Sequence, residues 1–165
     1  MRKFLFFSSI ILAISSCSFK VNRTGYQKTD TNLNSSVAIP IQRYQPIPDS
    51  VARVVGEIKL GESGFSTRCK ESDAIHILQR EAATVGADLI NIVEEKRPDV
   101  ISSCYRCKAT FYKYIKPGNA VSGSEWYAAK NIDTRAKEDR KKTTALIWGG
   151  VIGGIIGGFL ASQLY

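Results

Sequence analysis

The stretch SDAIHILQREAATVGADLINIVEE, residues 72–95, decides the predicted fold because its hydrophobic pattern changes from helical to strand-like at one glycine. Ser72 can cap a helix, Asp73 suits the positive helix end, and Gly86 is the expected C′ residue. Beyond Gly86, ADLINIVEE is rich in β-branched residues and predicts a strand. Four apolar residues recur at the spacing of one helix face: Ile75, Leu78, Ala82 and Val85.

Strand-like segments lie on either side of this stretch. VARVVGEIKL, residues 51–60, and CYRCKATFYKYIK, residues 104–116, both alternate in the way that is typical of half-buried strands. VAIPI, residues 37–41, has a strand-like composition, but Pro40 cannot donate a ladder hydrogen bond, so this strand is expected at a sheet edge. In the segment 51–60 the predicted core face carries Val54, Gly56, Ile58 and Leu60.

These segments together predict an α+β domain over residues 37–117. One helix is expected to cover a small sheet of three to four strands, in the order strand, strand, helix, strand, strand. A domain of this size buries only a modest core, so a covalent bridge would stabilise it considerably.

Three cysteines lie within the predicted domain. Cys104 and Cys107 have CxxC spacing, yet in a strand their Cα atoms would be about 10 Å apart, beyond the about 7 Å that a disulfide tolerates. A bridge between Cys69 and Cys104 is therefore favoured, with Cys107 as a small buried side chain. Two alternatives stay open: a redox pair of Cys104 and Cys107, and a zinc site, which would need a fourth ligand besides the three cysteines, since His76 is expected to be a solvated side chain.

The first 17 residues, MRKFLFFSSIILAISSC, have the order of an export signal: a basic start, then an apolar stretch too short to span a membrane. ISSC, residues 14–17, fits a lipobox, and the whole segment resembles bacterial lipoprotein signals. That resemblance implies removal of residues 1–16 and attachment of lipid to Cys17. Ser18, where an aspartate would favour retention, implies sorting to the outer membrane. An ordinary secretory signal is the alternative.

Two polar segments flank the predicted domain. Residues 17–36 lack periodicity and are expected to form a lipidated, flexible tether, because they cannot bury enough apolar area to offset the entropy of ordering. Residues 118–142 begin with GNAVSGS, which is expected to be a flexible joint. EWYAAKNIDTRAKEDRKK follows and predicts a solvated helix with a capping box of Ser122 and Glu125.

The last segment, residues 143–165, has no charged side chain. As a helix it would be about 35 Å long, enough to cross a hydrocarbon core of about 30 Å. It resembles the glycine-zipper segments of outer-membrane lipoproteins of the SlyB type, because two GxxxG stripes permit close helix approach in lipid. A span that is merely rich in glycine, or a buried hairpin, is the alternative. The predicted helix-packing residues are Gly149, Gly150, Gly153, Gly154, Gly157 and Gly158.

Three stretches in the middle of the chain resemble the periplasmic domain of the Rcs stress-sensor lipoproteins: VGEIKLGESGFSTRC, VGADLINIV and SCYRCKATFYKY. The resemblance covers about half the chain and implies the same α+β fold and a disulfide between Cys69 and Cys104. The chain departs from that family because it lacks the second bridge, which leaves Cys107 unpaired, and because it has a C-terminal membrane segment. The family's signalling partners are therefore not carried over.

The formal net charge of the chain is +8. No basic run is interleaved with stacking aromatic residues, so no nucleic-acid partner is expected, and a basic exported protein more often meets anionic membrane lipid. The sequence has no catalytic constellation: Glu94 and Glu95 are expected to be solvated, and no histidine accompanies Ser102 or Ser103. We expect no enzymatic activity, no cofactor and no metal site.

The resulting hypothesis is an outer-membrane lipoprotein that faces the periplasm and acts as a non-catalytic binding, sensing or structural module. Its glycine-rich tail would pack against a second copy or against another envelope membrane protein. The alternatives are an adaptor tethered to the inner membrane and a thiol oxidoreductase that uses Cys104 and Cys107.

Overall fold

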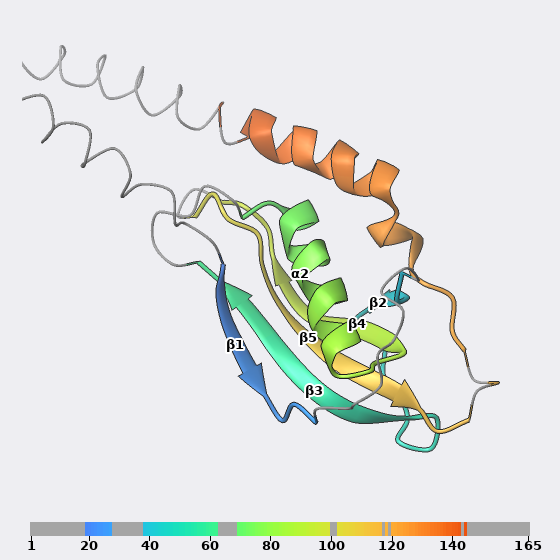
Figure 1. Ribbon diagram of the computed structural model, residues 1–165. Helices are drawn as coiled ribbons and strands as arrows, with labels where there is room; N and C mark the ends of the chain where they lie inside the picture. The colour runs from blue at the N-terminus through green and yellow to red at the C-terminus, as the bar shows by residue number, and fades with distance from the viewer. Residues whose placement is uncertain are drawn as a thin grey trace, which may run out of the picture.

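The computed structural model describes residues 19–27, 38–62, 69–99, 102–116, 118, 120–142 and 144. The predicted α+β class is confirmed: a mixed sheet carries one helix on its face, and a second helix lies near the C-terminal end of the described chain (Figure 1). In chain order the elements are β1 (Lys20–Thr24), β2 (Ile41–Arg43), β3 (Ala52–Gly61), α2 (Glu71–Thr84), β4 (Leu89–Lys96), β5 (Arg106–Tyr114), the 3-10 helix η3 (Glu125–Tyr127) and a helix over 129–142.

The sheet has five strands in the order β1-β3-β5-β4-β2, more than the three to four predicted. The neighbours pair antiparallel, except that β2 runs parallel to β4. β2 occupies the sheet edge that Pro40 predicted, although the strand starts after the proline, at Ile41. Pro40 has no N–H to donate, but its carbonyl oxygen still accepts from the backbone N–H of Ile90 at 2.9 Å.

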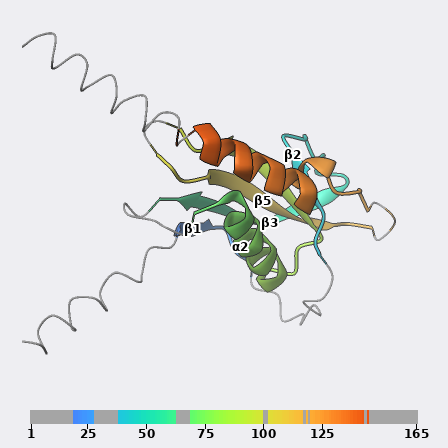
Figure 2. The same ribbon diagram turned by 90° about the horizontal axis from the view of Figure 1, so that it is seen from above.

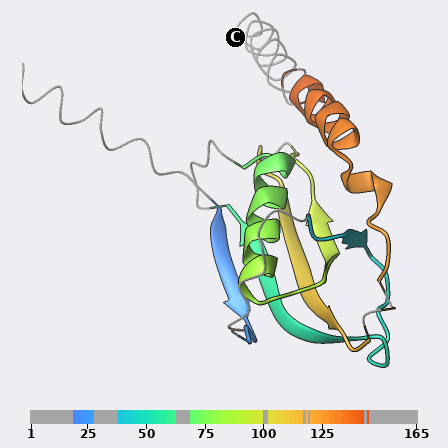
Figure 3. The same ribbon diagram turned by 45° about the vertical axis from the view of Figure 1, so that its right-hand side comes forward.

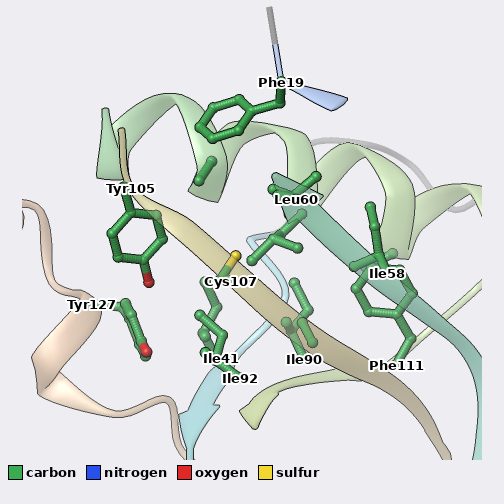
Figure 4. Packing of buried hydrophobic residues seen from close by; sticks show 14 of the residues in the cluster. Phe19, Ile41, Ile58, Leu60, Ile90, Ile92, Tyr105, Cys107, Phe111 and Tyr127 are labelled. Carbon is green, nitrogen blue, oxygen red and sulfur yellow. The ribbon is translucent and has the colours of Figure 1, made fainter. Parts of the chain in front are cut away.

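Helix α2 lies across one face of the sheet (Figures 1 and 3). Ala74, Leu78 and Ala82 are fully buried along its inner side, at the spacing of one helix face. The sheet supplies the other half of the core, and Figure 4 shows its side chains gathered in one cluster. The labelled members from β3, β4 and β5 are Ile58, Leu60, Ile90, Ile92, Cys107 and Phe111.

The ends of α2 were predicted with mixed success. Gly86 has φ +63°, a left-handed conformation that glycine adopts without strain, and it follows the C-cap Val85 as predicted. The predicted N-cap, Ser72, is wrong, because the helix already begins at Glu71 and Lys70 occupies the cap position. The Asp73 carboxylate accepts from the backbone N–H of Lys70 at 3.1 Å and so satisfies one of the free donors at this helix end.

The predicted core face of β3 holds only in the second half of the strand. Ile58 and Leu60 are buried, but Val54 is 42% exposed while its neighbour Val55 is buried. The pairing of β3 with β5 shifts register between Val54 and Gly56. A bulge of this kind adds one residue to the strand, so the side chains before it point to the opposite face.

The flexible tether predicted over residues 17–36 is wrong for its first part. Phe19 is buried in the core, and β1 pairs with β3 along its whole length, from Lys20 opposite Gly61 to Thr24 opposite Glu57. Tyr26 then packs on Phe111 with ring centroids 6.0 Å apart. This packing is possible because residue 56 is glycine: a Cβ there would lie 2.8 Å from Cδ1 of Tyr26. The rest of the predicted tether, residues 28–36, lies outside the described residues.

The predicted helix of the segment 118–142 is present over 129–142 and is mostly exposed, but the expected flexible joint is wrong and the helix packs on the domain. The backbone N–H of Ser124 donates to the Ile41 carbonyl at 2.7 Å, which fastens this segment to β2. Ser124 is the N-cap, accepting from the Trp126 backbone N–H, so the predicted capping box of Ser122 and Glu125 is wrong. The helix over 129–142 lies alongside the domain (Figure 2), with Ile132 and Arg135 buried.

Within the described residues no helix has the length and apolar character needed to cross a bilayer. The predicted membrane segment over residues 143–165 is described only at Thr144, so it lies almost entirely outside that part of the chain.

Candidate functional site

The most distinctive polar arrangement is the site where the C-terminal helix docks on α2. The Glu71 carboxylate, at the start of α2, is only 3% exposed. Arg135 approaches it with two nitrogens, Nε at 3.1 Å and a terminal nitrogen on the other oxygen. Arg97 donates to the same carboxylate at 3.1 Å and to Asp139 at 2.6 Å. Two carboxylates and two guanidinium groups thus alternate, which satisfies charges that would be costly to bury alone.

A second buried carboxylate, Glu95 of β4, sits beside this site. Arg43 of β2 donates to it at 2.6 Å, and the hydroxyls of Tyr105 and Tyr127 donate at 3.0 and 3.2 Å. Figure 4 shows the two tyrosines near each other, with the hydroxyl end of Tyr105 directed toward Tyr127. Burial, with Glu95 close by, raises the pKa of both phenols, so they stay protonated hydrogen-bond donors.

Trp126 joins the two carboxylate sites. The guanidinium groups of Arg43 and Arg135 each lie 4.3 Å from the centroid of the indole ring. Each of these arginines is also held by a buried carboxylate, so the indole ring meets cations whose positions are already fixed. The result is a layered contact that ties η3 and the helix over 129–142 to both β2 and α2.

The far end of α2 has a matching contact with the N-terminal strand. Arg23 of β1 donates to both oxygens of Glu81, at 2.6 and 2.7 Å, and the Tyr26 hydroxyl donates at 3.2 Å. The hydrogen bonds and charge of Arg23 hold the pKa of Glu81 below its usual value, against the opposing effect of burial. Between the two glutamates, the Gln79 side-chain amide exchanges two hydrogen bonds with the Ile39 backbone. Polar groups of α2 therefore fasten three segments that are distant in sequence.

Both described chain ends lie at the same end of the domain. Lys20, which starts β1, is opposite Gly61, the last residue of β3. The last turns of the C-terminal helix reach this end through Asp139, which Arg97 joins to Glu71 at the start of α2. Figures 1 and 3 show the start of β1 and the last turn of the helix toward one end. Any membrane attachment before Phe19 and any attachment after Lys142 would therefore act on one end of the domain.

The predicted disulfide is confirmed. Cys69 and Cys104 are bonded, with Cα atoms 5.0 Å apart, and Cys107 is a buried free cysteine. Burial raises the pKa of the Cys107 thiol to about 12, and the nearby charges of Glu95 and Glu71 add to the effect. A thiol with so high a pKa has little thiolate at neutral pH, and the thiolate is the reactive form.

The other predicted site residues stand apart from this arrangement. Cys17 and the six glycines, Gly149, Gly150, Gly153, Gly154, Gly157 and Gly158, lie outside the described residues. His76 is exposed on the outer side of α2. In the described part of the chain no group of three or more metal-binding side chains comes together.

Sequence reasoning missed the buried charges of the docking site. The interpretation of Glu95 as solvated is wrong, since its side chain is only 4% exposed. Glu71 and Glu81 went unnoticed, although they stand three residues before Ala74 and three after Leu78, in register with the apolar stripe of α2. Carboxylates at both ends of the apolar face of α2 could have indicated that this face also binds cations.

Comparison of this chain with protein-family models, with curated proteins and with solved structures gives no match.

Proposed function

We propose that this chain is a lipid-anchored, non-catalytic module of the bacterial cell envelope, held at the outer membrane and facing the periplasm. Lipid on Cys17 would anchor the N-terminal side, and the segment 143–165 would attach the C-terminal side and pack against a second copy or another envelope membrane protein. The domain between them would serve binding, sensing or a structural role, as the likeness to the Rcs stress-sensor lipoproteins suggests.

The observation that most favours this function is that both described chain ends lie at the same end of the domain. A domain attached to one bilayer through both ends needs those ends on the same side, and β1 and the C-terminal helix meet that requirement. The Cys69–Cys104 disulfide agrees with export, because disulfides persist in oxidising compartments. The docked helix over 129–142 adds a rigid connection between the domain and the apolar segment.

The buried thiol weighs against the oxidoreductase alternative. A redox CxxC pair needs an accessible thiolate of lowered pKa. Here Cys104 is bonded to Cys69, and Cys107 lies in the core with its pKa raised to about 12. Within the described residues the docking site consists of structural ion pairs and tyrosine hydrogen bonds, which suit a binding or structural module.

Lipid attachment is tested by metabolic labelling with a radioactive fatty acid, followed by separation of inner and outer membranes on a density gradient. The wild-type chain is expected to carry label and to sediment with the outer membrane, and Cys17→Ser is expected to carry none. Cys107→Ser is the matched control, because it also removes one thiol and should keep the label. Absence of label from the wild type would overturn the lipoprotein assignment, and recovery with the inner membrane would favour the adaptor.

Tail packing is tested by crosslinking from residues 143–165 in intact membranes. Gly153→Leu places a bulky side chain on the predicted packing face and is expected to remove the crosslinked species. Ile152→Leu is the control, because it changes an apolar neighbour outside the glycine stripes and should leave the crosslinks in place. If both variants crosslink like the wild type, the tail does not associate through its glycines.

A further inference from the structure

We propose that the end of the domain that carries Lys20 and the start of α2 lies directly against the bilayer, where its exposed cations bind the phosphates of anionic lipid headgroups. This inference rests on the proposed lipidation of Cys17 and adds an orientation and a lipid-binding surface. The membrane-facing end is defined by the start of β1, the end of β3, the start of α2 and the last turn of the helix over 129–142.

The covalent connection leaves no room for a long spacer. Cys17 is two residues from Phe19, and two residues span at most about 7 Å between their Cα atoms. Phe19 is 5% exposed, packed in the core, and β1 begins at the next residue. A lipid on Cys17 would therefore hold the folded domain close to the lipid headgroups, at a distance of only one or two residues along the chain. A flexible tether over residues 17–36, as the sequence predicted, would have allowed the domain to stand tens of ångströms away.

The helix over 129–142 gives the same restraint on the other side. Its last described turn is followed at once by the uncharged segment 143–165. Because Arg135 and Asp139 fix this helix to the domain through Glu71 and Arg97, the point where the apolar segment begins is held close to this end of the domain. Two short attachments at one end of a rigid body leave that end facing the membrane.

Charge at this end suits anionic headgroups. Five exposed cations lie at this end of the domain, where the described chain begins and ends. Within the described residues none of them takes part in an ion pair: Lys20, Lys70, Arg140, Lys141 and Lys142. Most carboxylates nearby are engaged with protein groups, whereas Glu138, next to Asp139 on the C-terminal helix, is exposed. Glu62 and Asp99 pair with Arg106, Glu71 and Asp139 pair with arginines, and Asp73 accepts from the Lys70 backbone.

The opposite end of the domain lacks such an excess. Around the start of β3 and the end of β5 the charged side chains are mixed in sign: Arg53, Lys113, Lys116, Asp49 and Asp88. Two of these are engaged within the domain, since Lys113 donates to the Gly86 carbonyl and Asp88 accepts from the Tyr114 backbone. Cations near an anionic membrane surface are attracted to it, so the end that gathers unpaired cations is the one drawn to the headgroups.

The orientation is tested with the full-length, lipidated protein in vesicles of phosphatidylglycerol and phosphatidylcholine that contain a headgroup-attached quencher. Lys96 lies at the membrane-facing end, because it pairs with Arg106 at the start of β5, beside the end of β3. A fluorophore is placed there through Lys96→Cys, or at the opposite end through Lys116→Cys. Buried Cys107, with its raised pKa, does not compete for the label. Position 96 is expected to be quenched several-fold more than position 116. Equal quenching, or stronger quenching at 116, would overturn the inference.

The role of the cations is tested by the same quenching assay, with the fluorophore at position 96 (Lys96→Cys). The test variant is Lys20→Gln/Lys70→Gln, at the membrane-facing end. The matched control is Lys113→Gln/Lys116→Gln, at the opposite end. The first pair is expected to reduce quenching at position 96, as is replacement of phosphatidylglycerol by phosphatidylcholine, while the control pair leaves quenching unchanged. Quenching that responds to neither change would overturn headgroup binding.

Flotation and the mass of the lipidated N-terminal peptide are recorded for each sample. A chain without lipid contradicts the proposed function, whereas a lipidated chain with equal quenching contradicts only the orientation.

Discussion

Arg135 and Glu71 lie 64 residues apart in the sequence and form a two-point ion pair that is buried between the C-terminal helix and α2. Arg97 shares the same carboxylate, and Trp126 covers the Arg135 guanidinium. The helix over 129–142 presents only one buried aliphatic side chain to the domain, Ile132. Its position therefore depends on charge pairing more than on hydrophobic area.

Arg135→Ala is expected to release the C-terminal helix. The substitution leaves Glu71 with one of its two cations and removes a cation from the Trp126 ring, and breaking a buried pair costs about 3–5 kcal/mol. We expect about 2–4 kcal/mol here, because Arg97 still pairs with Glu71. Denaturant unfolding and hydrogen exchange over 129–142 measure the effect. Lys137→Ala, on the exposed side of the same helix, should change neither. Unchanged exchange protection in Arg135→Ala would show that the ion pair does not hold the helix.

Glu81→Gln is expected to destabilise the fold at neutral pH and to have little effect in acid. The pKa of Glu81 is lowered in the folded state, so its ion pair stabilises the fold above the unfolded carboxyl pKa. That contribution is lost as the pH falls through the lowered value. The difference between wild type and variant should be about 1–2 kcal/mol at pH 7 and should shrink below about pH 4. The exposed Glu94→Gln is the control, and a pH-independent difference for Glu81→Gln would contradict the role of Arg23.

Phe19→Ala is expected to destabilise the domain by about 2–4 kcal/mol, because it removes a buried aromatic side chain and leaves a cavity. Lys20→Ala, at the exposed next position, should change the free energy of unfolding by less than about 0.5 kcal/mol. Thermal or urea unfolding of both variants in detergent gives the comparison. If the two variants unfold alike, residue 19 belongs to a tether rather than to the core.

Removal of the disulfide through Cys69→Ser/Cys104→Ser is expected to lower the free energy of unfolding by about 4 kcal/mol, from the loop-closure entropy of a loop of this length.

Cys107→Ala tests the remaining thiol and should lower the free energy of unfolding by about 1 kcal/mol, since it removes one buried sulfur atom. Alkylation of Cys107 in the wild type should be slow until the protein unfolds, because the thiol is buried and its pKa is about 12. Rapid alkylation of the native protein would place Cys107 at the surface.

Local patterns in the sequence predicted the helix, three of the strands and the disulfide. α2 and β4 could be recognised because periodicity and Gly86 mark their limits within 24 residues of chain. The disulfide followed from strand geometry, which keeps Cys104 and Cys107 apart. These features depend on short-range backbone conformation, which a single sequence records directly.

The parts that the sequence did not predict depend on contacts between distant residues. β1 has only Val21 as an apolar side chain, with Phe19 just before it, so its pattern resembles that of a polar tether. It is ordered by pairing with β3 and by the ion pair of Arg23 with Glu81, 58 residues away. The C-terminal helix itself was predicted, but its docking on the domain was not, because its buried face carries Arg135. Periodicity of apolar residues cannot reveal a face whose main contact is an arginine.

Strand β1 also shields the outer edge of β3. It covers residues 57–61 of that strand, and Gln27 continues the pairing with a hydrogen bond to the Val55 carbonyl at 3.0 Å. Without residues 19–27, a ten-residue strand would offer its unpaired backbone to other copies, which is a recognised route to aggregation. A soluble form made by trimming the predicted export signal should therefore start no later than residue 18, and a start only a few positions further on should precipitate during expression.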